Sequence, residues 1–153
     1  MNELFSDCES LENIDDISKW NTTAVINMGY LFNNCIKLEN VTNLSDWDFK
    51  KVKNMNNMFG NCISLTKICN FPETKTLNVR DISFMFENCI KLESLPEKFE
   101  FEPKKIVDMS YLFYKCIKLS KKEITDKIDI NKFIYAEKTE IFEGYQSNNC
   151  CIM

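Results

Sequence analysis

The sequence predicts an α/β repeat solenoid, an arc of about five strand–turn–helix repeats of 27 residues each. The first observation is a fixed period, because the segment at 32–38 (FNNCIKL) recurs with small variations. Three columns keep this period: Phe5, Phe32, Phe59, Phe86 and Phe113; Cys8, Cys35, Cys62, Cys89 and Cys116; Leu11, Leu38, Leu65, Leu92 and Leu119. A fixed period of this length is typical of repeat architectures. The second observation is that 153 residues with 44% hydrophobic content suffice for one domain with a core.

The second half of each repeat is predicted to be a helix. Val25, Met28, Leu31, Phe32 and Cys35 are spaced by one, three or four residues, which places them on one helical face. The expected helix boundaries are Thr22, Thr76 and Pro103 at the beginning and Asn34, Asn61 and Asn88 at the end. Asparagine suits the end of a helix because it tolerates the left-handed backbone conformation needed there.

The first half of each repeat is predicted to contain a short strand. Residues 38–41 (LENV) are apolar at both ends and include a β-branched residue. Strands stack at about 4.8 Å, whereas packed helices need roughly 10 Å each. We therefore expect the stack to bend, with the strands on its inner face.

The chain divides into three predicted segments. Residues 1–119 form the solenoid, and residues 120–144 form a C-terminal cap because the fifth repeat becomes charged after Leu119. Terminal repeats of solenoids are expected to be atypical and polar on the outside. Residues 145–153 are predicted to be a flexible tail.

Composition argues against several function classes. The net charge of −4 gives no electrostatic footprint for nucleic acid. The absence of histidine removes the commonest general base and metal ligand. The first residues have neither a basic n-region nor an apolar h-region, so we expect no secretory signal. We predict a protein that is not an enzyme and that uses no metal and no cofactor.

The cysteine column admits three interpretations. Metal binding is disfavoured because no CxxC pair occurs and a spacing of 27 residues does not bring four ligands together. Disulfides need Cα atoms within about 7 Å, and neighbouring helix ends should lie further apart. We therefore expect each thiol to be a small buried apolar group. Cys69 falls outside the column.

A second column is acidic and is predicted to form an interaction face. Its members are Glu12, Glu39, Thr66 and Glu93, each 27 residues from the next. Stacked strands would place Glu12 and Glu39 about 5 Å apart, close enough to raise a carboxyl pKa. A carboxylate pair could serve acid–base chemistry, but the sequence places no nucleophile beside it. The alternative is a solvated surface that attracts a basic partner.

The last four residues, Cys150-Cys151-Ile152-Met153, fit a C-a-a-X prenylation signal with Cys150 as the acceptor. The alternative is an exposed cysteine pair without a role. The tail from Tyr145 contains no basic residue, so a single lipid chain would anchor the protein weakly and reversibly. We therefore expect association with the cytoplasmic face of a membrane, together with a soluble pool.

The repeat motif resembles the BspA-like leucine-rich-repeat family, including repeats of mycoplasma surface lipoproteins and protist BspA-like proteins. The residues that carry the resemblance are Asn27, Met28, Leu31, Phe32, Cys35, Leu38 and Val41, with their counterparts over roughly residues 4–119. The resemblance implies a leucine-rich-repeat-like arc and a cell-surface protein, in some members one that adheres to host or matrix proteins.

Two function hypotheses follow from these observations. The first is a non-enzymatic protein–protein interaction module, tethered to a membrane by prenylation at Cys150, with a protein partner and no nucleic acid. The alternative is the BspA-like cell-surface adhesin. No oligomeric state follows from the sequence.

Overall fold

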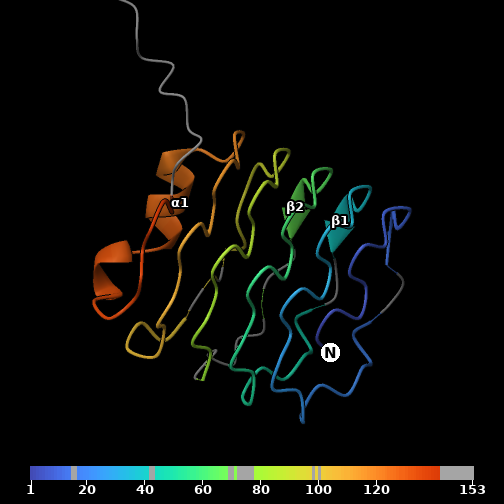
Figure 1. The fold of residues 1–153 in the computed structure, drawn as a ribbon, viewed down its shortest axis with the longest axis horizontal. Coiled ribbons are helices and arrows are strands. Elements are labelled where there is room, and N and C mark those ends of the chain that lie inside the picture. The colour runs from blue at the N-terminus through green and yellow to red at the C-terminus, as the bar shows by residue number, and fades with distance from the viewer. Residues whose placement is uncertain are drawn as a thin grey trace, which may run out of the picture.

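The computed structural model describes residues 1–14, 17–41, 44–68, 71, 78–97, 99 and 101–141. Successive repeats of the chain lie side by side, from the blue N-terminal end to the orange segment beside the helix (Figure 1). Most of the described residues lie in turns and loops.

Regular elements are few in the described ranges. The strands β1 (Asn40–Val41) and β2 (Lys67–Ile68) form a parallel two-stranded sheet, with Asn40 opposite Lys67 and Val41 opposite Ile68. The helix α1 (Lys121–Lys127) and the 3-10 helix η1 (Ile130–Lys132) follow near the C-terminal end. Both lie in the segment that the sequence predicts to be a C-terminal cap.

The predicted α/β solenoid of strand–turn–helix repeats is wrong. Within the described residues, the second half of each repeat contains no helix, and the strand predicted at 38–41 is reduced to Asn40–Val41. Residues 29–34 instead form turns, and Asn27 forms an isolated parallel bridge with Asn54. Thr22, which was predicted to begin a helix, is buried. Its hydroxyl accepts a hydrogen bond at 2.7 Å from the N–H of Asp48, which belongs to the next repeat. Thr76 lies outside the described residues.

Backbone hydrogen bonds explain why a helical pattern of apolar residues gives turns. The N–H groups of Tyr30 and Phe32 donate to Asn56 and Met58 of the next repeat, at 2.9 Å each. The intervening Leu31 donates back to Met28, at 3.3 Å. Alternate donors are therefore used between repeats, and a continuous helical ladder cannot form.

Two positions in each repeat adopt the left-handed conformation. Asn34, Asn61 and Asn88 have φ of 60°, 59° and 58°, so the left-handed conformation predicted for them is confirmed, although no helix precedes them. The bulky Tyr30 and Phe84 also have φ of 55° and 56°. A positive φ costs energy in such residues, and the hydrogen bonds between repeats offset that cost.

The core consists of columns of residues 27 positions apart. Met28, Leu31, Phe32 and Cys35 are each fully buried and Val25 is half-buried, so the burial predicted for this face is confirmed for four of its five residues although the helix is not. The rings of the phenylalanine column stack on one another with centroid separations of 5.4–5.7 Å: Phe5, Phe32, Phe59, Phe86 and Phe113. Apolar burial and aromatic stacking thus bind each repeat to its neighbours.

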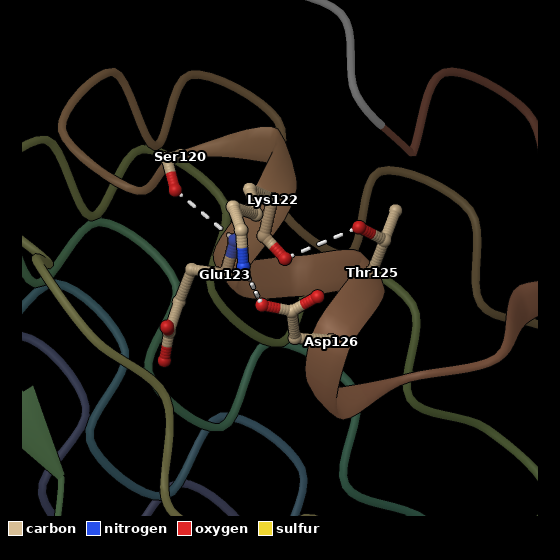
Figure 2. Close-up of polar contacts among 5 residues, drawn as sticks. All are labelled: Ser120, Lys122, Glu123, Thr125 and Asp126. Carbon is tan, nitrogen blue, oxygen red and sulfur yellow. Dashed lines mark hydrogen bonds and ion pairs between the residues drawn. The ribbon is translucent and has the colours of Figure 1, made fainter.

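The helix α1 begins at a capped N-terminus and is fixed to the fourth repeat. The hydroxyl of Ser120 accepts the N–H of Glu123 at 3.0 Å, and the hydroxyl of Thr125 donates to the carbonyl of Lys122 (Figure 2). The Lys122 ammonium pairs with Asp126 one turn later. The Glu123 carboxylate accepts the N–H of Leu95 at 3.1 Å. Ile124 beneath it is fully buried.

Residues after η1 continue the pairing between repeats. The N–H groups of Met109, Tyr111 and Phe113 donate to Glu137, Thr139 and Ile141, at 2.8–3.3 Å. The spacing between donor and acceptor residues is larger here than between the preceding repeats, because α1 and η1 lie in between. Among the described residues no helix is both long and apolar enough to cross a lipid bilayer.

Candidate functional site

The acidic column predicted as an interaction face is a row of stacked backbone positions. The N–H of Glu39 donates to the carbonyl of Glu12 at 3.2 Å, Thr66 donates to Glu39 at 3.0 Å, and Glu93 donates to Thr66 at 3.1 Å. The Thr66 hydroxyl also donates to the Glu39 carbonyl at 3.2 Å. The structure therefore brings all four predicted residues together, with the three carboxylates exposed.

Lysines in a parallel row neutralise the two ends of this glutamate column, which is defined as Glu12, Glu39, Thr66 and Glu93. The ammonium of Lys37 lies 3.9 Å from the Glu12 carboxylate, and that of Lys118 lies 2.9 Å from Glu93. Each lysine belongs to the repeat after its glutamate. The hydrogen bond from Lys118 lowers the pKa of Glu93.

The pairing pattern is interrupted in the central repeat. Ser64 occupies the lysine position that would face Glu39, and Thr66 occupies the glutamate position that would face Lys91. Both Glu39 and Lys91 are exposed. In the part of the chain that the structure describes, neither side chain has an oppositely charged group within ion-pair distance. The glutamate column and the parallel lysine row therefore present an uncompensated negative charge at Glu39 and an uncompensated positive charge at Lys91, two repeats apart.

The cysteine column is buried and hydrogen-bonded rather than reactive. The thiols of Cys35, Cys62 and Cys89 each donate to a phenylalanine carbonyl of the preceding repeat at 3.1 Å. Burial is the main cause that raises the thiol pKa of Cys35 and of Cys116 to about 12. The expected burial is confirmed for Cys35, Cys62, Cys89 and Cys116, whereas Cys8 is half-buried, and the hydrogen bond was not predicted. The recurrence of a thiol donor every 27 residues is the sequence signal that could have indicated this hydrogen bond.

The structure describes most residues that could bind a metal, but it does not describe the predicted lipid acceptor. Among the described residues, no group of three or more histidine, cysteine, aspartate or glutamate side chains could hold a metal ion. The cysteines described from Cys8 to Cys116 are free thiols. Cys69 and the predicted lipid acceptor Cys150 lie outside the described residues.

A cavity of about 350 Å³ lies between Phe99, residues 101–103 and the end of α1. Phe99, Phe133 and Ile128 supply its buried apolar wall, and Lys127 and Lys132 are among its polar lining residues. Lys132 pairs with Asp129 at 3.6 Å. Sequence reasoning missed this cavity because its walls come from segments without a shared periodicity.

Comparison with known proteins gives one informative result. None of the curated proteins and none of the solved structures compared with the chain matches it significantly. Residues 1–128, most of the chain, match a family that is linked broadly with BspA-like repeat proteins. The chain therefore belongs to the family described as Mycoplasma protein of unknown function, DUF285.

Proposed function

We propose that the protein is a non-enzymatic interaction module that binds a segment of a protein partner along the glutamate column. The single observation that carries the proposal is the interrupted charge pattern, in which Glu39 and Lys91 are exposed without an oppositely charged partner in the described chain. Backbone hydrogen bonds fix Glu39 relative to Thr66 and Glu93, and Glu93 follows Lys91 by two residues. A prearranged surface of this kind reduces the entropy lost on binding.

The partner segment is expected to carry a basic side chain opposite Glu39 and an acidic side chain opposite Lys91. The small side chains of Ser64 and Thr66 between them leave room for the backbone of that segment. Complementary charges of this type set register and association rate more than affinity. Apolar contacts of the segment with neighbouring repeats would supply the remaining binding energy.

The test is a quantitative pull-down from the native cell with a charge-swapped variant. The double substitution Glu39→Lys and Lys91→Glu keeps the net charge but reverses the pattern, so a specific partner should be lost. The matched control, Glu3→Lys with Lys138→Glu, changes two exposed positions outside the column. A partner retained equally by the wild type and both variants would exclude the column as its binding site.

A second candidate function is that of a BspA-like cell-surface protein that binds host or matrix proteins. The observation that favours it is the family match over residues 1–128. The two candidates differ in the side of the membrane on which the repeats reside. A membrane-impermeant label applied to intact cells should modify exposed lysines of a surface protein, and it should leave a protein on the cytoplasmic face unmodified.

A further inference from the structure

A second exposed face is built from two columns of side chains. These columns occupy other positions of the repeat than the glutamate column does. Ile26, Lys53, Arg80 and Val107 form the first column, in which each N–H donates to the carbonyl of the preceding member at 2.7–2.8 Å. Ala24, Lys51, Asn78 and Lys105 precede them by two residues and form the second column. All eight side chains are exposed. These eight residues are called the basic face.

A buried column separates the two exposed columns. Val52, Val79 and Ile106 lie between them in the chain and are fully buried, whereas the residues on either side are exposed. The hydrogen bonds within the first column place its members about 4.8 Å apart, as in a parallel sheet. A regular two-column array of side chains results.

The basic face concentrates positive charge on a protein whose net charge is −4. Of its eight residues, Lys51, Lys53, Arg80 and Lys105 are cationic and none is acidic. None of these four has a carboxylate within ion-pair distance in the described chain. Lys50 and Lys104 adjoin the face and are exposed as well. The face therefore carries a cluster of uncompensated cations.

Four acidic side chains near the face along the chain accept local hydrogen bonds, and the half-buried Glu102 precedes Lys105 by three residues. The carboxylates of Asp81 and Asp108 accept the N–H groups of Ser83 and Ser110, at 3.0 and 2.8 Å. Asp48 similarly accepts the N–H of Lys50 at 2.8 Å. Glu137 follows Val107 in the stack and accepts the Thr139 hydroxyl at 2.8 Å. These bonds hold the acidic groups at the border of the face.

Apolar side chains occupy the two ends of the first column. Ile26 is 54% exposed and Val107 is 57% exposed, although both are aliphatic. They flank the adjacent cations Lys53 and Arg80. An array of cations bordered by exposed aliphatic groups combines the two contributions by which peripheral proteins bind anionic bilayers, namely charge attraction and shallow apolar insertion.

We propose that the basic face docks on an anionic phospholipid surface. The cations contact lipid head groups, while Ile26 and Val107 enter the interfacial region. Nucleic acid is less well matched, because the eight residues include no aromatic ring on which a base could stack. An acidic protein would satisfy the cations but gives no reason for aliphatic side chains at both ends. The proposal does not depend on what binds the glutamate column.

The test measures binding of the full chain, purified from bacteria and therefore not prenylated, to vesicles by co-sedimentation. The wild type should bind vesicles of phosphatidylcholine with phosphatidylserine and should not bind vesicles of phosphatidylcholine alone. Removing two charges with Lys53→Gln and Arg80→Gln should weaken binding roughly 25-fold, about fivefold for each charge. Raising the salt concentration should weaken the wild type more than the variant.

The matched control removes two exposed lysines outside both faces, with Lys67→Gln and Lys115→Gln. This variant has the same net charge and should bind like the wild type. Equal weakening in both variants would refute a specific face and indicate only overall charge. The proposal would also be overturned by equal binding to neutral vesicles, or by displacement from anionic vesicles at stoichiometric concentrations of single-stranded RNA or polyglutamate.

Discussion

Replacing Phe59 by leucine tests whether the aromatic column holds the repeats together. The Phe59 ring is fully buried and stacks on Phe32 and Phe86, with centroid separations of 5.6 and 5.5 Å. Leucine keeps most of the apolar burial and removes both ring pairs. Each aromatic pair contributes about 0.5–1.5 kcal/mol beyond burial. We therefore expect the free energy of unfolding to fall by about 1–3 kcal/mol, and by about 3–5 kcal/mol for Phe59→Ala.

Urea unfolding followed by circular dichroism provides the assay. The midpoint should shift while the slope with denaturant stays constant, because the surface exposed on unfolding changes little. The exposed Tyr135 gives a control, since Tyr135→Leu should change stability by no more than about 0.5 kcal/mol. If Phe59→Leu unfolds like this control, the reasoning from stacked rings is refuted.

Three further predictions concern the core, the thiols and the tail. Leu65→Ala in the central repeat should cost about 2–5 kcal/mol in the same assay, and a cost within error would mean that the core face is misplaced. Because the folded thiol pKa of Cys35 and Cys116 lies above the unfolded value near 9, stability should be full below pH 9 and fall toward pH 12. The double variant Cys35→Ala, Cys116→Ala should show a shallower fall, and an identical profile would contradict buried, protonated thiols. For a chain that ends at Met153 in a eukaryotic cytosol, Cys150→Ser should move protein from the membrane to the soluble fraction; an unmodified C-terminal peptide in mass spectrometry would refute this.

The sequence predicted which residues meet, because the columns follow directly from the period of 27 residues. Alignment of the repeats was sufficient to predict that Phe32, Cys35 and Leu38 are buried. It also predicted that Glu12 and Glu39 lie side by side in neighbouring repeats. The left-handed conformation at Asn34 also followed from residue type. These features depend on local chemistry and on which positions recur.

The backbone conformation of each repeat could not be predicted in the same way. Apolar residues at Met28, Leu31, Phe32 and Cys35 fit one face of a helix, and they fit a series of turns equally well. The choice depends on whether the N–H of Tyr30 bonds within its own repeat or to Asn56 of the next. Such a long-range contact leaves no mark on a short window of sequence.

The basic face was missed for a related reason. Lys53 and Arg80 lie 27 residues apart, so the short basic run at 50–53 (KKVK) is not connected with Arg80 until the repeats are aligned, while the net charge of −4 points away from an anionic ligand. Placing each charge in its repeat column would have revealed the cluster. The cavity beside Phe99 offered no such signal, because α1 has no common period with Phe99 and residues 101–103.

The most direct test of the stacked repeats is a nuclear magnetic resonance measurement of scalar couplings across backbone hydrogen bonds. The structure predicts couplings from the Tyr30 amide to the Asn56 carbonyl and from the Thr66 amide to the Glu39 carbonyl. Both the glutamate column and the basic face depend on such bonds between repeats. Couplings from each amide in residues 25–35 to the carbonyl four positions earlier would instead indicate a helix and would contradict the account.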